Sequence, residues 1–377
     1  MPESNTRKGP LAGIRIVDLT AMVMGPYATQ IMADMGADVI KVEAPAGDDT
    51  RYISVGPAPG MGGIFVNVNR GKRSIVLDLR TPEGKAALTE LIRTADVFIH
   101  SMRSKAIARL GFAYEDVAAI NPSIVYTNCY GYGRRGPDAD LPAYDDTIQA
   151  ECGLPAVQQM LTGQADFIGT IMADKVAGLT CLYSTVMALF HRERTGEGQE
   201  VEIGMFETMA AFMLVEHANG ALFDPPLGEA FYPRVVSPNR KPYQTKDGQI
   251  SALIYNDKHW ATFINAVQPA WASDEFARLD VQDFAQRAAG GRTEADDVAD
   301  AGRARQAFDH HGVGPDGGDD AAMRHQRVLV RQGLEPGDQR VEIDGSAISG
   351  GMHRSAFSWS LRCRGSSHWR SRSCAAP

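Results

Sequence analysis

The sequence predicts an α/β fold built around a doubly wound, mainly parallel sheet. Short apolar runs rich in β-branched residues alternate with longer stretches of helical periodicity over the first 220 residues, a pattern typical of parallel strands joined by crossover helices. The length of 377 residues allows two domains at about 150 residues each, and a hydrophobic content of 44% can fill their cores. A small disulfide scaffold is thereby excluded.

Each element follows from a local pattern. Ile16 and Val17 lie in an apolar run that predicts a buried strand, and the Gly25-Pro26 pair indicates a turn before the first helix. The expected strands are 11–19, 38–43, 74–79, 96–99, 123–129 and 200–203, and the expected helices are 27–35, 82–94, 106–120, 174–194 and 206–219.

The stretch 174–194 is the clearest helix in the sequence. Six apolar residues recur at helical spacing, and Gly196 provides a helix stop. The six are Leu179, Leu182, Tyr183, Val186, Met187 and Phe190. The face that these side chains form is apolar enough to predict that it belongs to the protein core.

Composition divides the chain into domains. We expect a large α/β domain over 1–220, a proline-rich linker over 221–246 and the start of a smaller domain over 247–280. Within the last of these, 247–255 indicates a short hairpin and 260–267 a helix.

The segment 281–377 is atypical. From 285 to 377, Leu, Ile, Val and Phe account for 12 of 93 residues, a low apolar content for a packed core. All nine lysines and all eleven tyrosines come before residue 259. A disordered tail or a divergent domain could have this composition. Our hypothesis is a frameshift in a GC-rich coding sequence, because Lys and Tyr, which have AT-rich codons, disappear together. Resequencing the gene distinguishes the frameshift from the other two.

Charge and targeting signals limit the possible partners. With 38 basic and 46 acidic residues the formal charge is −8, which disfavours nucleic-acid binding by the whole molecule. The polar N-terminus carries no export signal, and no apolar stretch is long enough for a membrane span. The five cysteines form no C-x-x-C, and His310-His311 has no third ligand at useful spacing. We therefore expect a cytoplasmic protein with neither a membrane partner nor a metal site.

A single Gly-x-Gly-x-x-Gly motif occurs at residues 131–136, after a predicted strand. A dinucleotide fingerprint must open a helix whose N-terminus binds pyrophosphate. Pro137 and Asp138 follow here instead, so a glycine-rich loop is favoured over a nicotinamide site.

Basic residues gather just before one predicted strand and just after another. The run 67–73 includes Arg70 and Lys72, and Arg103 and Arg109 follow the strand 96–99. A solvated charge run is the common explanation for such a segment. The alternative is a site for a small anion, because ligands of open α/β sheets bind at the carboxyl ends of the strands.

Asp174 stands at the start of the strongest helix. On spacing alone a helix N-cap is the favoured role. The functional alternative relies on the same physics, since a helix N-terminus stabilises an ionised carboxylate, and a carboxylate placed there can act as a nucleophile.

Six stretches together resemble the class III (CaiB/BaiF) CoA-transferases, a family that includes formyl-CoA and carnitine CoA-transferases and the α-methylacyl-CoA racemases. They are LAGIRIVDLT at 11–20, GP at 25–26, MGADVIKVE at 35–43 with Pro45, NRGKRSIVLDL at 69–79, ADV at 95–97 and RTGEGQ at 194–199. They cover residues 11 to about 265 in the family's order.

The resemblance implies a Rossmann-like large domain with a mainly parallel sheet, a smaller α+β domain and an interlocked homodimer. It implies coenzyme A as a co-substrate, no tightly bound cofactor, and transfer of CoA from an acyl-CoA to a small carboxylic acid. The family's nucleophilic aspartate corresponds to Asp174, in Ala173-Asp174-x-x-x-Gly178. Its implied contacts to CoA are Asn69, Arg70, Lys72, Arg103 and Arg109.

Two departures from the family pattern matter. His100-Ser101-Met102 stands where many members have Glu-Asn-Phe, and Tyr144 takes the place of the histidine that the racemase branch needs. A tyrosine, with a pKa of about 10, is a poor general base at neutral pH, so a transferase is favoured over a racemase. A catalytically inactive CoA-binding protein is the third hypothesis, because of the atypical C-terminal segment.

Overall fold

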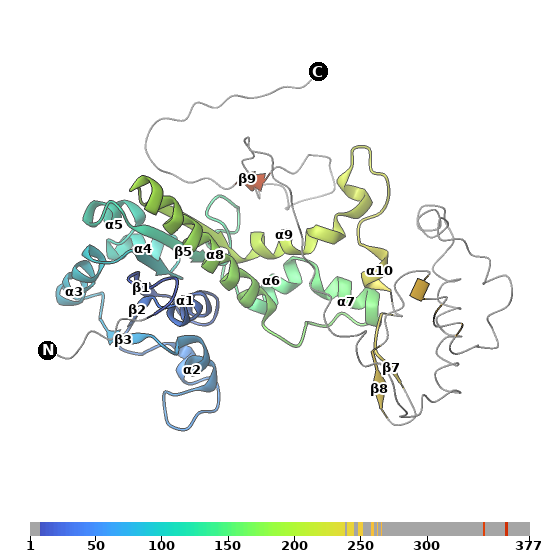
Figure 1. Ribbon diagram of the computed structural model, residues 1–377, viewed down its shortest axis with the longest axis horizontal. Coiled ribbons are helices and arrows are strands. Elements are labelled where there is room, and N and C mark those ends of the chain that lie inside the picture. The colour runs from blue at the N-terminus through green and yellow to red at the C-terminus, as the bar shows by residue number, and fades with distance from the viewer. Residues whose placement is uncertain are drawn as a thin grey trace, which may run out of the picture. The chain divides into compact units, whose positions relative to one another are not determined.

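A six-stranded parallel sheet forms the centre of the protein (Figure 1). The computed structural model describes residues 8–237, 240–244 and 248–251, the single residues 258, 259, 262 and 265, and the backbone of 342–343 and 359–360. The strand order is β3-β2-β1-β4-β5-β6, so the topology switches direction between β1 and β4. The strands are β1 Arg15–Leu19, β2 Asp38–Glu43, β3 Arg73–Val76, β4 Val97–His100, β5 Val125–Tyr130 and β6 Gln199–Gly204.

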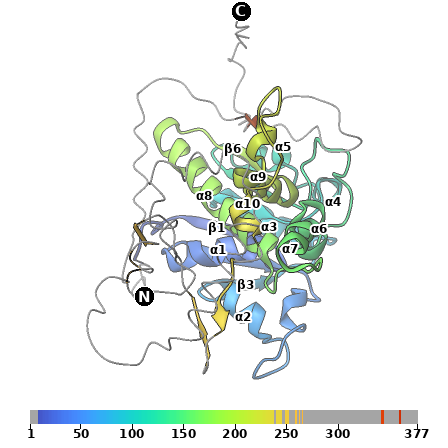
Figure 2. The same ribbon diagram turned by 90° about the vertical axis from the view of Figure 1, so that its right-hand side faces the viewer.

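Helices cover both faces of the sheet, as the predicted doubly wound fold requires. The helices are α1 Met24–Asp34, α2 Gly63–Asn69, α3 Pro82–Arg93, α4 Ser104–Leu110, α5 Tyr114–Ile120, α6 Asp145–Glu151, α7 Leu154–Thr162, α8 Met172–Thr195, α9 Met205–His217 and α10 Pro233–Val236, with 3-10 turns η1 Asp49–Arg51 and η2 Asn219–Leu222. Figure 2 shows the arrangement from a second side, with α8 beside α9.

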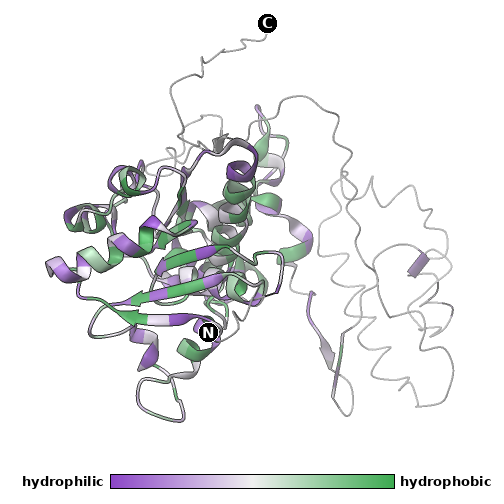
Figure 3. Cartoon of the chain, turned by 60° about the vertical axis from the view of Figure 1, so that its left-hand side comes forward, coloured by the Kyte–Doolittle hydropathy of each residue, from purple (hydrophilic) through white to green (hydrophobic). Residues whose placement is uncertain are grey.

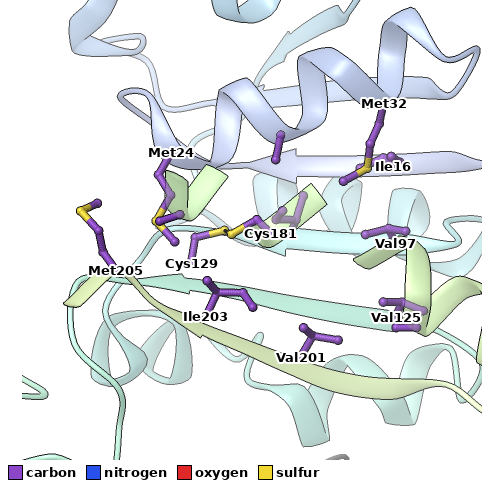
Figure 4. Close-up of a cluster of buried hydrophobic side chains, with 14 of the residues drawn as sticks. Ile16, Met24, Met32, Val97, Val125, Cys129, Cys181, Val201, Ile203 and Met205 are labelled. Carbon is purple, nitrogen blue, oxygen red and sulfur yellow. Dashed lines mark hydrogen bonds between the residues drawn. The ribbon is translucent and has the colours of Figure 1, made fainter. Parts of the chain in front are cut away.

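Alternating side chains of the strands enter two separate cores. Ile16 packs with α1, α8 and α9 on one face, whereas its neighbour Val17 packs with α3, α4 and α5 on the other. Figure 4 shows the first core, in which Met24 and Met32 of α1 face the strands. The four inner strands β1, β2, β4 and β5 are hydrophobic over much of their length (Figure 3), as expected where both faces are buried, whereas the edge strand β3 is exposed.

The chain divides into two compact units. One comprises Met1–Gln159, Gln164–Phe231 and Asp338–Pro377, and the other comprises Met160–Gly163 and Tyr232–Gly337. The first unit holds the parallel sheet, and β9 Glu342–Ile343 pairs antiparallel with β10 Trp359–Ser360. In the second unit α10 is followed by an antiparallel pair, β7 Tyr243–Gln244 and β8 Gln249–Ile250. Within the described residues, no helix combines the length and apolar character that a membrane span requires.

The alternation of strands and helices is confirmed, and two local predictions are wrong. The expected helix 106–120 is two helices, because α4 ends at Gly111, whose φ of 82° belongs to the left-handed region. Gly25 and Pro26 form no turn but lie in the first turn of α1, where proline is well tolerated. The helices α2, α6, α7 and α10 were not predicted from the sequence. The predicted helix 260–267 and the segment 281–377 lie largely outside the described residues.

The predicted burial of the apolar face of α8 is confirmed only in part, since Leu182 packs against the first core but most of that face is exposed within this chain. Leu179, Tyr183, Met187 and Phe190, called here the α8 stripe, are between 43% and 65% exposed. The buried face of α8 instead carries small residues, because α8 packs very closely on α1. A Cβ at Gly178 would lie 2.7 Å from the Met24 carbonyl oxygen, so only glycine permits this approach.

Candidate active site

The topological switch between β1 and β4 places two loops next to each other. The β1–α1 loop covers residues 20–23 and the β4–α4 loop covers residues 101–103. The Ala21 N–H donates to Ser101 Oγ at 3.0 Å and so connects the two loops. Open α/β sheets bind their ligands in the crevice at such a switch, which makes this edge of the sheet the expected location of a site.

Asp174 reaches this edge from α8. It is the third residue of the helix, and Ile171 occupies the N-cap position, so the N-cap role considered for Asp174 is wrong. Its half-buried carboxylate instead accepts a hydrogen bond from the Met24 N–H, with 3.1 Å between the nitrogen and Oδ1. Met24 begins α1, where backbone N–H groups have no acceptor within the helix. The starts of two helices therefore meet at one carboxylate.

Asp145, which supports Asp174 from α6, was not predicted from the sequence. Asp145 is buried, and its Oδ1 accepts from the Asp174 N–H at 3.0 Å. Gln149 donates to the other oxygen of Asp145, and its own Oε1 accepts from the Ile168 N–H at 3.1 Å. A signal was available, because Asp145 belongs to Ala143-Tyr144-Asp145-Asp146, which was considered only for its missing histidine.

The surroundings of Asp174 change its acidity. Burial and the nearby negative charge of Asp145 raise its pKa to about 6, and the Met24 N–H opposes them because it stabilises the ionised form. The carboxylate is therefore mostly ionised at neutral pH but more basic than an exposed aspartate. A raised pKa of this kind makes a carboxylate a better nucleophile or base.

Lys72 and Asn69, two of the predicted CoA contacts, belong to a buried polar cluster. The Lys72 side chain is 2% exposed, and its Nζ donates to Asp18 Oδ2 at 3.0 Å, to Asn69 Oδ1 at 2.8 Å and to the Pro26 carbonyl at 3.0 Å. All three ammonium protons are thus used inside the protein. Arg70 pairs with Asp34 at 2.7 Å on the surface.

Arg103 and Arg109 differ from these residues because their charges are available. Arg103 occupies the N-cap position of α4 and Arg109 lies in its last turn, and both are exposed. Neither side chain forms a hydrogen bond or an ion pair with another described residue. Lys105, between them, pairs with Asp140. Unpaired guanidinium groups beside the switch-point loop are suited to phosphate groups.

His100 holds the loop that carries Arg103. The ring is fully buried, its Nδ1 accepts from the Met102 N–H at 3.1 Å, and its Nε2 lies 2.9 Å from Tyr126 Oη. Tyr126 donates its own proton to the Phe112 carbonyl, so the ring proton lies on Nε2. Burial lowers the pKa of His100 to about 4, and the ring is neutral at physiological pH.

The glycine motif at 131–136 forms a loop and opens no helix. The Gly133 N–H donates to Glu207 Oε1 at 2.8 Å, and Arg134 pairs with Glu200 and Glu202. Because a carboxylate already occupies this amide, the structure supports the prediction of a glycine-rich loop over a nicotinamide site.

Comparison with known proteins identifies the class. The profile of CoA-transferase family III matches residues 11–307, and the chain therefore belongs to this family. The match extends beyond about residue 265, the end of the region that the resemblance covers, and enters the segment 281–377.

Two curated relatives and one solved structure define the similarity further. The chain is 36% identical over 278 residues to the succinate–glutarate CoA-transferase of Agrobacterium fabrum, covering 70% of this chain and 68% of that protein. It is 40% identical over 214 residues to the acetyl-CoA:oxalate CoA-transferase of Acetobacter aceti, covering 56% of this chain and 54% of the relative. A CaiB/BaiF family protein from Brucella suis superimposes with a TM-score of 0.63 at 29% identity, covering 79% of this chain and 82% of that one.

Proposed function

We propose that the protein transfers CoA from an acyl-CoA thioester to a small carboxylic acid, with Asp174 as the nucleophile. The observation that carries this proposal is the position of Asp174, half-buried at the switch point and hydrogen-bonded to Met24 N–H. Membership of CoA-transferase family III supports the reaction class.

The proposed chemistry needs only one carboxylate on the enzyme. Asp174 attacks the thioester carbonyl, the C–S bond breaks, and CoA leaves as a thiolate from an aspartyl acyl anhydride. The thiolate then attacks the aspartyl carbonyl, which releases the donor acid and leaves an aspartyl-CoA thioester. The acceptor carboxylate attacks this thioester to form a second anhydride, and the thiolate returns to the acceptor's acyl carbon. Asp174 is regenerated, and the net change is an exchange of CoA between two acids.

For CoA binding, Arg103 and Arg109 are the better supported of the predicted contacts. Their exposed and unpaired guanidinium groups can meet the phosphates of the nucleotide, whereas the Lys72 ammonium is saturated by Asp18, Asn69 and Pro26. The roles of Asn69, Arg70 and Lys72 as CoA contacts stay predictions.

The α8 stripe supports the expected homodimer. Four large apolar side chains on one helix face are exposed within a single chain, and such a surface is normally covered. A second copy of this chain is the partner that the family resemblance implies. Sedimentation equilibrium tests it, and a monomeric mass would contradict it.

A thioester-exchange screen tests the proposed function. The purified protein is incubated with acetyl-CoA or succinyl-CoA and with succinate, glutarate or oxalate, the acids that appear in the relatives' names. New acyl-CoA products are expected for at least one pair. Deuterium wash-in at the α-carbon of a branched acyl-CoA without transfer would instead support a racemase. CoA binding with neither reaction would indicate an inactive binding protein.

Replacing Arg103 and Arg109 together with alanine should weaken CoA binding by about tenfold to a hundredfold, because two charge-assisted contacts are lost. The dissociation constant of CoA, measured by calorimetry at two salt concentrations, gives the effect and its electrostatic origin. Arg93→Ala serves as the control, since Arg93 pairs with Glu90 at the end of α3. Equal affinities for the double variant and the control would contradict the assignment.

A further inference from the structure

The β1–α1 loop holds one residue in a strained conformation. Met22 has a φ of 65°, in the left-handed region that residues other than glycine rarely adopt. Met22 lies two residues before Met24, whose N–H contacts Asp174. Strain of this kind persists only where the surrounding structure fixes the backbone, so the loop needs a restraint.

A buried ion pair provides that restraint. Lys41 Nζ lies 2.9 Å from Asp48 Oδ2, and each side chain is 1% exposed. Lys41 Nζ also donates to the Thr20 carbonyl at 2.8 Å, and Asp48 Oδ1 accepts from the Met22 N–H at 3.4 Å. The two residues therefore hold the loop at its first residue and at the strained one.

The ion pair is itself fixed in place. Asp48 is the N-cap of η1, and its Oδ1 also accepts from the Thr50 N–H at 3.0 Å. Its own N–H donates to Glu43 Oε2 at 3.2 Å, and Glu43 in turn pairs with Arg51 at 2.6 Å. The remaining charged neighbours are Asp18 and Lys72, which pair with each other. Three carboxylates and three cations balance within this cluster, so it can stay buried.

We propose that Lys41 and Asp48 are positioning residues, which hold the β1–α1 loop so that the Met24 N–H points at Asp174 Oδ1. In the described part of the chain, neither residue forms a hydrogen bond or an ion pair with Asp174, so any effect on it passes through the loop. The inference rests on the proposed function only in giving Asp174 a catalytic role. The position of the loop is a property of the protein without bound substrate.

The position of the Met24 N–H matters because it stabilises the ionised carboxylate. Asp174 faces the like charge of Asp145, and its burial also favours the neutral acid. Among the described residues that influence its acidity, the Met24 N–H is the group that lowers the pKa. Loss of the loop conformation should therefore raise the pKa of Asp174, so that the carboxylate stays protonated up to a higher pH.

The test replaces both members of the ion pair, in the variant Lys41→Met with Asp48→Ser. Removing both charges avoids a lone buried ion, and serine can still cap η1. Asp174 is titrated with a diazo reagent, which esterifies protonated carboxylic acids, and the modified peptide is quantified by mass spectrometry. We expect a midpoint near pH 6 for the unmodified protein. For the variant we expect a midpoint near pH 7, which is about a tenfold change in the protonation equilibrium.

A matched control and a rescue make the test specific. Arg73→Met with Asp38→Ser removes, by similar substitutions, the surface ion pairs that Asp38 makes with Arg73 and Arg15 at the opposite end of β2, and should leave the midpoint unchanged. Adding Met22→Gly to the Lys41/Asp48 variant should return the midpoint toward pH 6, because glycine adopts a positive φ without strain. A purely structural role for the ion pair predicts no such rescue.

A single substitution keeps the inference testable if the double variant does not fold. Met22→Val places a β-branched residue at the positive φ and should raise the midpoint in the same way. An unchanged midpoint in a folded Lys41/Asp48 variant, or in Met22→Val, would overturn the inference. The titration needs no acyl-CoA, so a protein without transferase activity would refute the proposed function and still allow this test.

Discussion

Replacing Asp174 with alanine is expected to reduce CoA transfer by at least about a thousandfold, because the proposed reaction has no alternative nucleophile at this position. With the unmodified protein, acyl-CoA and hydroxylamine should trap the covalent intermediate as a hydroxamate on Asp174. The variant should form no such adduct. It should still bind CoA, because the Asp174 carboxylate that it lacks has no expected contact with the nucleotide.

Asp146→Ala is the matched control for this substitution. Asp146 is an exposed carboxylate on α6, next to Asp145, and its removal should leave both transfer and trapping within about twofold of the original. Hydroxamate formation on a different residue, or full transfer by the Asp174 variant, would refute the nucleophile assignment.

The rate should also depend on pH in a way that the structure specifies. The nucleophile is the ionised carboxylate, and the pKa of Asp174 is about 6. Transfer should therefore be near its plateau above pH 7 and fall about tenfold for each pH unit below 6. An ordinary exposed aspartate would keep its full rate down to about pH 5, so the position of the fall reports the environment of Asp174.

The order of strands and helices could be predicted because the signals for it are local. Apolar runs of β-branched residues and helical periodicity lie within single elements, and each of the six strands lies mostly within its predicted range. The α8 stripe shows the limit of such reasoning. Periodicity identifies an apolar face correctly, but which face packs on α1 depends on how close two backbones come at Gly178.

The site was predictable only in its central residue. The sequence placed Asp174 at a helix start, but its hydrogen bond to Met24 spans 150 positions and its link to Asp145 spans 29. Periodicity and spacing within single elements cannot predict contacts between residues so far apart in the sequence. The basic run 67–73 illustrates the opposite error, since residues that look alike in sequence divide into a buried Lys72 and an exposed Arg70.

Lys72→Met is expected to destabilise the protein strongly, because it leaves the Asp18 carboxylate buried without its partner. Asp18 is fully buried, and removing one member of such an ion pair costs about 3–5 kcal/mol. Lys105→Met is the matched control, because Lys105 and Asp140 form an exposed pair whose loss should cost no more than about 1 kcal/mol. Urea unfolding of both variants at pH 7 measures the difference in the free energy of unfolding.

The pKa values of Asp18 and Lys72 predict that the free energy of unfolding also depends on pH. Burial alone would raise the pKa of Asp18, but the Lys72 and Lys41 ammonium groups and the hydrogen bonds from Thr20 and Thr29 together outweigh it and lower the pKa to about 2. A carboxyl with a lowered pKa stabilises the fold above its unfolded pKa, and this contribution is lost as the pH falls from about 4 through 2. Burial also lowers the pKa of Lys72, to about 8, so desolvation of the ammonium outweighs its attraction to Asp18. In the Lys72→Met variant the acid-induced loss of stability should therefore be smaller.

The same variant decides between two roles for Lys72. If its main role is the ion pair, the free energy of unfolding falls and the folded fraction binds CoA with nearly unchanged affinity. If Lys72 instead contacts CoA, as the family resemblance implies, stability changes little and affinity falls by about tenfold or more. The three hydrogen bonds that its ammonium makes to Asp18, Asn69 and Pro26 favour the first result, because a phosphate could recruit Lys72 only by breaking them.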